Sequence, residues 1–198
     1  MGRPEQHLPI FPLNTVLFPG GPLSLRVFEP RYLDMVKECT REDTEFGVCL
    51  ILHGAEAGSA AAPVGLGTTA RIVDFFTMED GLLGIRATGV QRFRLGSTWV
   101  RDNGLLMAEV EMLAPPAATP LDTRYLLLRT LLERLLENVA EHYPHAGQQE
   151  LGDSDWVACR LSELLPLELD VKQQLLETDD PQERLDQLIE LVPTLQSD

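Results

Sequence analysis

The sequence predicts an α+β protein in which a small β-barrel lobe precedes a helical bundle. Residues 8–113 are short runs rich in Val, Ile, Phe and Thr, separated by Gly, Pro and Asx turns. Residues from 121 onward carry leucines at steps of three and four, as amphipathic helices do. The proline-rich segment between them cannot continue a central strand or a helix interior. We therefore expect a barrel lobe at 1–113, a hinge at 114–120 and a bundle at 121–198.

Period-two patterns and turn dipeptides place the strands. Leu23, Leu25 and Val27 alternate with their neighbours, which predicts a strand with two distinct faces. The apolar run 46–52 predicts a buried strand, and the Ala- and Gly-rich segment 53–63 predicts a mobile loop. Asp80-Gly81 and Asn103-Gly104 accept the positive φ of tight turns. They predict two hairpins, 70–78 with 82–90 and 93–100 with 105–112. Six or so short strands favour a closed or half-closed barrel.

Helix signals surround these strands and fill the second lobe. Pro30 starts one helix, with Tyr32, Leu33, Met35 and Val36 as its apolar stripe. The long helix from Leu121 to Val139 carries additional leucines, Leu126, Leu127 and Leu131, which predict packing on more than one side. Acids at 153 and 155 precede the next helix, which Pro166 ends or kinks. A short helix at 170–177 follows. Asp180-Pro181 then begins a helix with Leu185, Leu188, Ile189 and Val192 on its buried face.

Charge and cysteine usage limit the partners. The net charge is −15, and residues 114–198 hold 17 acids and 6 bases against 14 and 10 in residues 1–113. Phosphate backbones and anionic lipids bind clustered Lys and Arg, so neither nucleic acid nor membrane is an expected partner. No signal-peptide or membrane-spanning pattern is visible, and we expect a cytoplasmic protein. Cys39, Cys49 and Cys159 lie among apolar neighbours and predict buried free thiols.

Motifs that would carry catalysis, a cofactor or a metal are weak. The stretch from Gly65 to Ala70 fits the dinucleotide-binding spacing G-x-G-x-x-A, but residues 71–76 read as a strand where that motif needs a helix. His142 and His145 flank Pro144 with no further ligands nearby, which favours a solvated helix end over a metal site. The sequence contains no G-x-S-x-G elbow, Walker loop or H-E-x-x-H pair. We expect no catalytic residues, no cofactor and no metal.

Ordered motifs along the chain resemble a known family. Residues 8–20, ending in Val16-Leu17-Phe18-Pro19-Gly20, resemble the first strand and turn of the Lon protease N-terminal domain. Phe28-Glu29-Pro30-Arg31-Tyr32 resembles the form found in its stand-alone members. Residues 64–72 and 84–94 are similar to two further strands. Residues 172–177 and 183–185 resemble the helical close of the family. The resemblance covers nearly the whole chain.

The resemblance implies a PUA-like β pseudo-barrel packed against a helical bundle. It further implies a role in binding polypeptide rather than cutting it. Our leading hypothesis is a non-enzymatic module that binds unfolded or exposed polypeptide segments and acts as an adaptor in protein quality control for a separate ATPase. Because Lys172 lies in the helical motif, it is not expected to be a catalytic lysine. Two alternatives stay open: a small-molecule-binding or hydrolytic enzyme using the barrel cavity, and a PUA-like nucleic-acid binder, which the charge disfavours.

Four residues are the candidates for peptide binding: Phe18, Phe28, Arg31 and Tyr32. Aromatic and proline-rich loops suit extended apolar segments, and Arg and Tyr are enriched at interfaces. Phe18 has a competing interpretation as a plug at one end of the barrel, because apolar residues are more often core than ligand site. Glu29 and Arg31 have one as a local ion pair at the start of a helix. Our hypothesis is a shallow groove bordered by these four residues.

Overall fold

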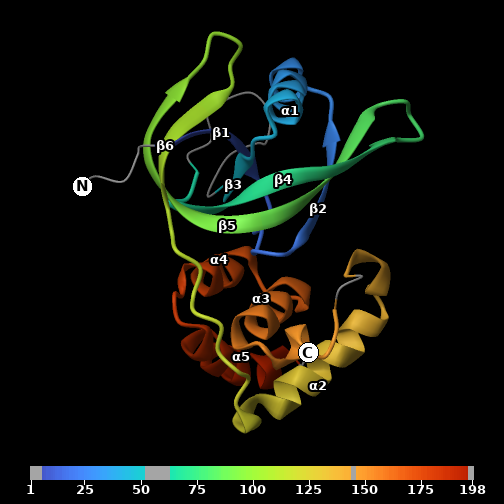
Figure 1. The fold of residues 1–198 in the computed structure, drawn as a ribbon, viewed down its shortest axis with the longest axis vertical. Coiled ribbons are helices and arrows are strands. Elements are labelled where there is room, and N and C mark those ends of the chain that lie inside the picture. The colour runs from blue at the N-terminus through green and yellow to red at the C-terminus, as the bar shows by residue number, and fades with distance from the viewer. Residues whose placement is uncertain (1–5, 52–62, 144–145, 196–198) are drawn as a thin grey trace. The chain divides into compact units, whose positions relative to one another are not determined.

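The computed structural model describes residues 6–51, 63–143 and 146–195. Its contacts divide the chain into two compact units, Met1–Pro115 and Pro116–Asp198, so the division falls within the proline-rich segment. The first unit holds the sheet and one helix, and the second holds helices alone, which confirms the α+β class (Figure 1). Across the described ranges, no helix combines the length and apolar composition needed to cross a bilayer.

The first unit is built from six strands and one α-helix. These elements are β1 (Gln6–Leu13), β2 (Pro22–Val27), α1 (Pro30–Glu42), β3 (Phe46–Leu50), β4 (Leu66–Thr77), β5 (Leu83–Val100) and β6 (Leu106–Met112). Gly81 and Gly104 take φ of 81° and 83° in the two hairpin turns, as their dipeptides predict. The predicted loop 53–63 lies almost entirely outside the described residues; its last residue, Pro63, pairs with Ile51.

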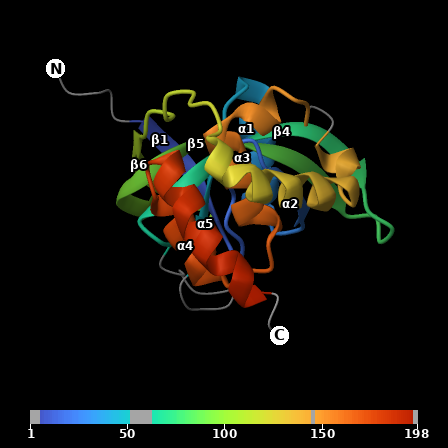
Figure 2. The same cartoon turned by 90° about the horizontal axis from the view of Figure 1, so that it is seen from below.

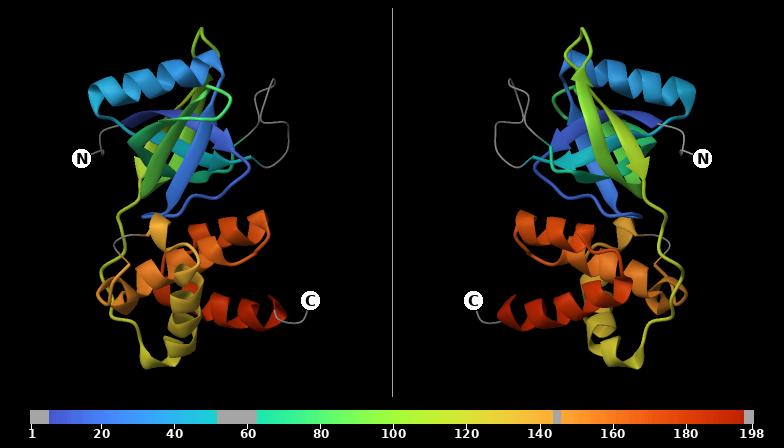
Figure 3. Two further views of the ribbon diagram at one scale, coloured as in Figure 1. Left: turned by 90° about the vertical axis from the view of Figure 1, so that its right-hand side faces the viewer. Right: turned by 90° about the vertical axis from the view of Figure 1, so that its left-hand side faces the viewer.

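The sheet closes on itself. Its order is β2-β5-β4-β3-β1-β6, and an additional β5–β6 pairing joins β6 back to β5. Five strands therefore form a ring, while β2 is attached outside it along β5 (Figure 3). One prediction was wrong: residues 82–90 and 93–100 are not separate strands. They form the continuous strand β5, which pairs with β2 and β4 along its first part and with β6 along its end. The change of pairing partner along β5 leaves no turn signal in its sequence, so the sequence does not reveal that the two segments form one strand.

The core of this unit lies between the sheet and α1. Tyr32, Met35, Val36 and Cys39 form the buried stripe of the helix, as predicted, and pack into a cluster with side chains from the sheet. Pro30 occupies the first turn, where a missing amide donor leaves no helical hydrogen bond unmade. A second cluster packs Ile10 and Phe93 against Ala108 and Val110 of β6. The barrel interior is therefore packed.

A two-pronged ion pair fastens α1 to the end of β5. Arg101 Nη1 lies 2.7 Å from Glu38 Oε2, and Nη2 lies 3.3 Å from Oε1. The hydrogen bond from Arg101 lowers the pKa of Glu38 below its usual 4.5. A carboxyl whose pKa is lower in the folded state stabilises the fold above its unfolded pKa, and that stabilisation is lost as the pH falls through the folded value.

Arg101→Gln is therefore expected to cost up to about 1 kcal/mol of unfolding free energy at pH 7, since both groups are partly exposed. The cost should shrink below about pH 4.5, where Glu38 becomes protonated in the unfolded chain. Urea unfolding at pH 3.5, 5 and 7 measures it. Lys37→Gln, whose 3.8 Å contact with Asp34 is exposed, serves as the control and should change little. A pH-independent cost would contradict the ionic origin.

The second unit is a set of short helices around α3. Its elements are η1 (Thr123–Tyr125), α2 (Leu126–Glu137), η2 (Ala140–His142), η3 (Glu150–Gly152), α3 (Ser154–Leu164), α4 (Leu169–Glu177) and α5 (Pro181–Leu195). Asp153 caps α3 by accepting from the Trp156 amide at 2.8 Å, and Asp180 accepts from the Gln182 amide at the start of α5. Helix α3 contacts α2, α4 and α5 (Figure 2), and its Val157 and Leu161 are fully buried.

Two expectations for this unit were wrong. Leu127 is 85% exposed and Leu126 is half exposed, so these two leucines do not widen the buried face of α2, whereas Leu131 is half-buried. Packing uses the narrower stripe of Leu128, Leu132 and Leu136, which recurs every four residues. Ile189 is 40% exposed, while Leu185 and Leu188 are buried as predicted. Among the two histidines considered for a metal, His142 contacts Glu141 at 3.5 Å and His145 lies outside the described residues.

Candidate functional site

A groove of about 520 Å³ opens where β2 and the end of β1 lie beside each other without pairing. We call it the β1–β2 groove. From Ile10 onward β1 pairs with β3 on one side only, because its pairing with β6 ends at Pro9. The groove is lined by Phe11, Pro12, Leu13, Asn14, Thr15, Leu23, Ser24, Leu25, Arg26, Phe28, Glu29 and Tyr32.

The floor of the groove is the edge of the hydrophobic core. Phe11 and Tyr32 stack with ring centroids 3.9 Å apart and planes 20° from parallel. Leu13, Leu23 and Leu25 pack against the same cluster but remain only partly buried. The ring of strands thus leaves apolar side chains accessible at this seam, and burying them under a ligand is favourable by about 25 cal/mol per Å² of apolar area.

Phe28 lines the groove, and Arg31 packs on Tyr32 of its floor. Phe28 is 58% exposed, which is unusual for an aromatic ring beside an apolar floor. Arg31 is held in place: its Nη2 lies 2.8 Å from Glu29 Oε2, its Nη1 donates to the Gly104 carbonyl at 3.3 Å, and its guanidinium lies 4.7 Å from the centre of the Tyr32 ring. Arg31 therefore packs on the Tyr32 ring and connects the start of α1 to the β5–β6 turn.

The structure brings three of the four candidate residues together. Phe28 and Tyr32 line the groove, and Arg31 packs on Tyr32. Tyr32 is buried, so it forms the floor and not an exposed rim. Phe18 is fully buried and does not line the groove. Its turn is fixed against β5, because the Gly20 amide donates to the Gly89 carbonyl and the Gly89 amide donates to Gly21.

Sequence reasoning missed the aliphatic half of the groove. Leu23 and Leu25 carry the alternation that predicts a strand, but that pattern does not say which edge stays unpaired. Leu13 reads as part of a buried first strand. The open side of β1 follows from its pairing with β6, which ends at Pro9. A single sequence does not show which strands pair.

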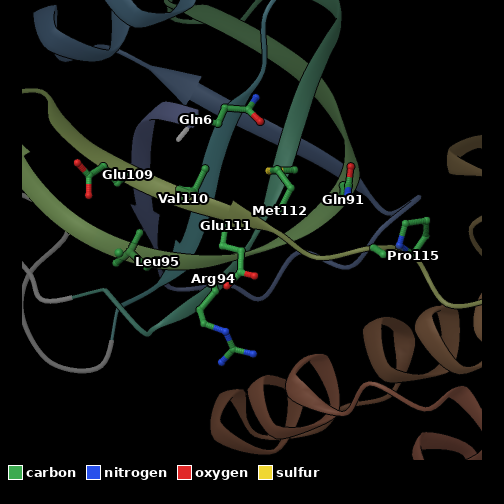
Figure 4. Close-up of a pocket in the computed structure, with 11 residues that line it drawn as sticks. Gln6, Gln91, Arg94, Leu95, Glu109, Val110, Glu111, Met112 and Pro115 are labelled. Carbon is green, nitrogen blue, oxygen red and sulfur yellow. The ribbon is translucent and has the colours of Figure 1, made fainter. Parts of the chain in front are cut away.

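A second, larger pocket of about 900 Å³ lies along β5 and β6. We call it the β5–β6 pocket. Val110 and Met112 extend from the same side of β6, with Gln6 and Gln91 nearby (Figure 4). Leu95, Arg94, Glu109 and Glu111 complete much of the lining, which continues to Pro115. Apolar and charged residues alternate along this lining, because successive side chains of a strand point to opposite faces of the sheet.

Groups capable of nucleophilic chemistry are placed for packing. Burial raises the pKa of the Cys49 thiol to about 12 and raises that of Cys39, so neither is a thiolate at neutral pH. All three cysteines are buried and free, as predicted. In the described part of the chain, no three His, Cys, Asp or Glu side chains gather closely enough to hold a metal ion.

Comparison with known families decides the identity. The model of the ATP-dependent protease La (LON) substrate-binding domain matches residues 7–194. The chain belongs to this family. A Lon N-terminal domain protein from Xanthomonas campestris has a crystal structure that is 43% identical, covers 93% of this chain and 98% of its own, and superposes with a TM-score of 0.78. The N-terminal domain of Mycobacterium avium complex Lon protease shares the fold at 19% identity and a TM-score of 0.68, covering 93% and 97%.

Among curated proteins, Lon protease 2 of Myxococcus xanthus is 31% identical over 195 residues, which is 94% of this chain. The Lon protease of Anaeromyxobacter dehalogenans is 30% identical over 93% of the chain. In both cases the chain spans 23% of the relative's length.

Two segments that resemble the family's helical close, residues 172–177 and 183–185, contain residues that join neighbouring helices. Lys172 Nζ donates to the Glu163 carbonyl at 2.7 Å, which fastens α4 to α3, and burial lowers the pKa of this lysine. Arg184 Nε donates to the Leu175 carbonyl at 2.7 Å, and its Nη1 lies 2.8 Å from Asp155 Oδ1. These two residues are structural ties between neighbouring helices.

Proposed function

We propose that this LON substrate-binding domain recognises unfolded or exposed polypeptide segments in the β1–β2 groove and performs no catalysis itself. The observation that supports this proposal is an accessible edge of the hydrophobic core, Leu13, Leu23 and Leu25, next to the exposed ring of Phe28. Unfolded segments differ from native surfaces in exposing apolar side chains on an available backbone. A partly open apolar groove can bind both the apolar side chains and the extended backbone of such a segment.

The charge of the chain favours polypeptide over nucleic acid. The net charge is −15. Arg26, which lines the groove, pairs with Asp80 at 2.6 Å, and Arg31, which packs on Tyr32 beside the groove, pairs with Glu29. No unpaired cation of the groove is therefore available to neutralise a phosphate. An apolar segment with basic flanks matches this surface better, because the long-range field attracts it.

The proposal is tested with a protein that can be presented folded or unfolded. Labelled α-lactalbumin in its native form, and the same protein reduced and carbamidomethylated so that its charge is unchanged, are titrated with the full chain by fluorescence anisotropy at physiological ionic strength. The unfolded form should bind and the native form should not. Equal binding of the two forms, or no binding of either, would contradict recognition of unfolded segments.

Phe28→Ser is expected to weaken binding of the carbamidomethylated protein by about tenfold or more, because exposed aromatic residues next to an apolar floor are frequent hot spots. Phe28 is more than half exposed, so folding stability should change little. Phe75→Ser is the matched control: Phe75 is 45% exposed on β4 and lies outside the groove lining. Equal losses in both variants would indicate non-specific apolar contact.

The role beyond binding that we propose is that of an adaptor, which presents bound segments to a separate ATPase. Affinity purification of the chain from its own cells, with and without mild heat stress, should enrich one ATP-dependent protease or chaperone. If Phe28→Ser abolishes unfolded-protein binding while no ATPase is enriched with the parent chain, the adaptor role fails and the binding role stands.

A second candidate function is small-molecule binding in the β5–β6 pocket. Its volume of about 900 Å³ is favourable, since ligand pockets typically hold about 300–1,000 Å³. Screening a metabolite collection by thermal shift tests this, with Ala114→Trp as the pocket-blocking variant because Ala114 lines the pocket and is exposed. A ligand whose stabilising effect disappears in that variant would support it.

A further inference from the structure

We propose that the bound segment adds to β2 as an extra β-strand, so that its backbone completes the sheet at the β1–β2 groove. This inference rests on the proposed function and specifies its binding mode. The occupant is an extended polypeptide segment with apolar side chains at every second position. The argument uses the free edge of β2, the blocked edge of β1 and the groove floor.

The free edge of β2 follows from its register with β5. The Gly89 amide donates to the Gly21 carbonyl at 2.9 Å, and Pro22 lies opposite Thr88. Hydrogen-bonded and non-bonded positions alternate along an antiparallel pair. The backbone groups of Leu23 and Leu25 therefore face β5, and those of Ser24 and Arg26 face away.

Nothing in the described part of the chain pairs with that outer edge. Strand β2 ends the sheet, and β5 is its one strand partner there. Ser24 and Arg26 are both exposed, and each presents one amide N–H and one carbonyl oxygen along the edge. A row of such groups is complementary to another extended backbone, which is how peptides are recognised by strand addition.

The facing edge of β1 cannot serve equally well. The Ile51 amide donates to the Leu13 carbonyl, so Leu13 faces β3 and the backbone of Pro12 faces the groove. Proline has no N–H to donate. The added strand therefore bonds to β2, and β1 forms the opposite wall.

The floor selects the side chains. In an extended segment successive side chains point to opposite faces, so every second one faces Leu13, Leu23 and Leu25. These leucines are partly buried edges of the core, and apolar groups of the ligand would cover them. The other side chains face away and can be polar.

The probe is a capped nonapeptide, Lys-Val-Thr-Val-Thr-Val-Thr-Val-Lys, titrated into the ¹⁵N-labelled full chain. On saturation, hydrogen exchange at the Ser24 and Arg26 amides should slow by about tenfold or more, as expected for amides entering a ladder. The Leu25 amide, which already faces β5, should change little. Unchanged exchange at Ser24 and Arg26 despite binding overturns strand addition.

N-methylation of the peptide provides an independent test. Methylating the central valine amides and methylating the threonine amides block opposite edges of the same strand. One series should lose about tenfold or more in affinity and the other should bind nearly as the parent does. Equal affinities for both series overturn the proposal.

Ser24→Pro and Ser24→Ala separate the backbone from the side chain. Proline removes an edge N–H that β5 does not use, and edge strands tolerate it. It should weaken nonapeptide binding by about tenfold, whereas Ser24→Ala should leave binding unchanged. Equal affinities of the two folded variants contradict the proposal. If Ser24→Pro does not fold, the exchange and N-methylation results decide.

The outcomes distinguish the binding mode from the function. If carbamidomethylated α-lactalbumin binds but the Ser24 amide exchanges unchanged, strand addition fails and the proposed function stands. If neither it nor the nonapeptide binds, both fail. If Ser24 and Arg26 are protected without peptide, increasingly so at higher protein concentration, a second copy of the chain occupies the edge and the proposal is overturned.

Discussion

Replacing Arg184 with methionine is expected to lower the unfolding free energy of the helical unit by about 3–5 kcal/mol, the usual cost of removing one partner of a buried ion pair. The side chain is 1% exposed. It donates to the carbonyls of Leu175 and Thr178, binds Asp155 and approaches Cys159 Sγ at 3.3 Å. Methionine fills a similar volume but leaves the two carbonyls and the carboxylate without their donor.

Urea unfolding followed by tryptophan fluorescence measures this loss. Each unit contains one tryptophan, so a Trp99→Phe background leaves Trp156 on α3 as the reporter of the helical unit. Arg124→Met is the matched control, because its 3.5 Å contact with Asp186 is half exposed, and it should cost less than about 1 kcal/mol. A similar small cost for Arg184→Met would show that the buried network contributes little.

Gly67→Ala is expected to destabilise the barrel unit by about 1–3 kcal/mol or more, as overpacked core positions do. A β-carbon at Gly67 would lie 2.3 Å from the Val48 carbonyl oxygen and 2.7 Å from Cys49 Sγ. The clash is with backbone, so no side-chain rotation relieves it. Gly65, two residues earlier, has no heavy atom within 4 Å of that position.

The same unfolding assay in a Trp156→Phe background, with Trp99 as the reporter, compares Gly67→Ala with Gly65→Ala. The second variant should change the unfolding free energy by less than about 0.5 kcal/mol. The pair also settles why these glycines imitate a nucleotide-binding motif: one is required by close strand packing and the other is incidental. Equal effects of the two variants would contradict this explanation.

Local features were predictable because they follow from short-range chemistry. Pro30 and Asp180 mark helix starts, and Gly81 and Gly104 adopt the positive φ that their turn dipeptides predict. Ordered motifs then identified the family, which its family model confirms over residues 7–194. Errors arose where tertiary pairing overrides local pattern, as in the continuous β5 and in the exposed Leu127.

The candidate groove was only partly accessible to sequence reasoning. Phe28 and Tyr32 were named because they lie in a motif that resembles the family and because Tyr and Arg are enriched at interfaces, and both line the groove. Phe18 has the same chemistry but is fully buried, and composition does not separate a buried ring from an exposed one. Ser24 attracts no notice in the sequence, since its proposed importance lies in an amide that every residue except proline has.

Because β2 lies outside the closed ring, it can be displaced from the sheet without opening the ring itself. The ring β6-β1-β3-β4-β5 is complete without β2, which is held by its ladder to β5 and by the packing of its leucines. Displacing β2 therefore breaks one ladder and leaves every pairing within the ring intact. Under the proposed binding mode, we expect the groove to widen by a local opening of β2 that costs less free energy than global unfolding. Segments of different bulk would then enter the same groove without breaking the ring.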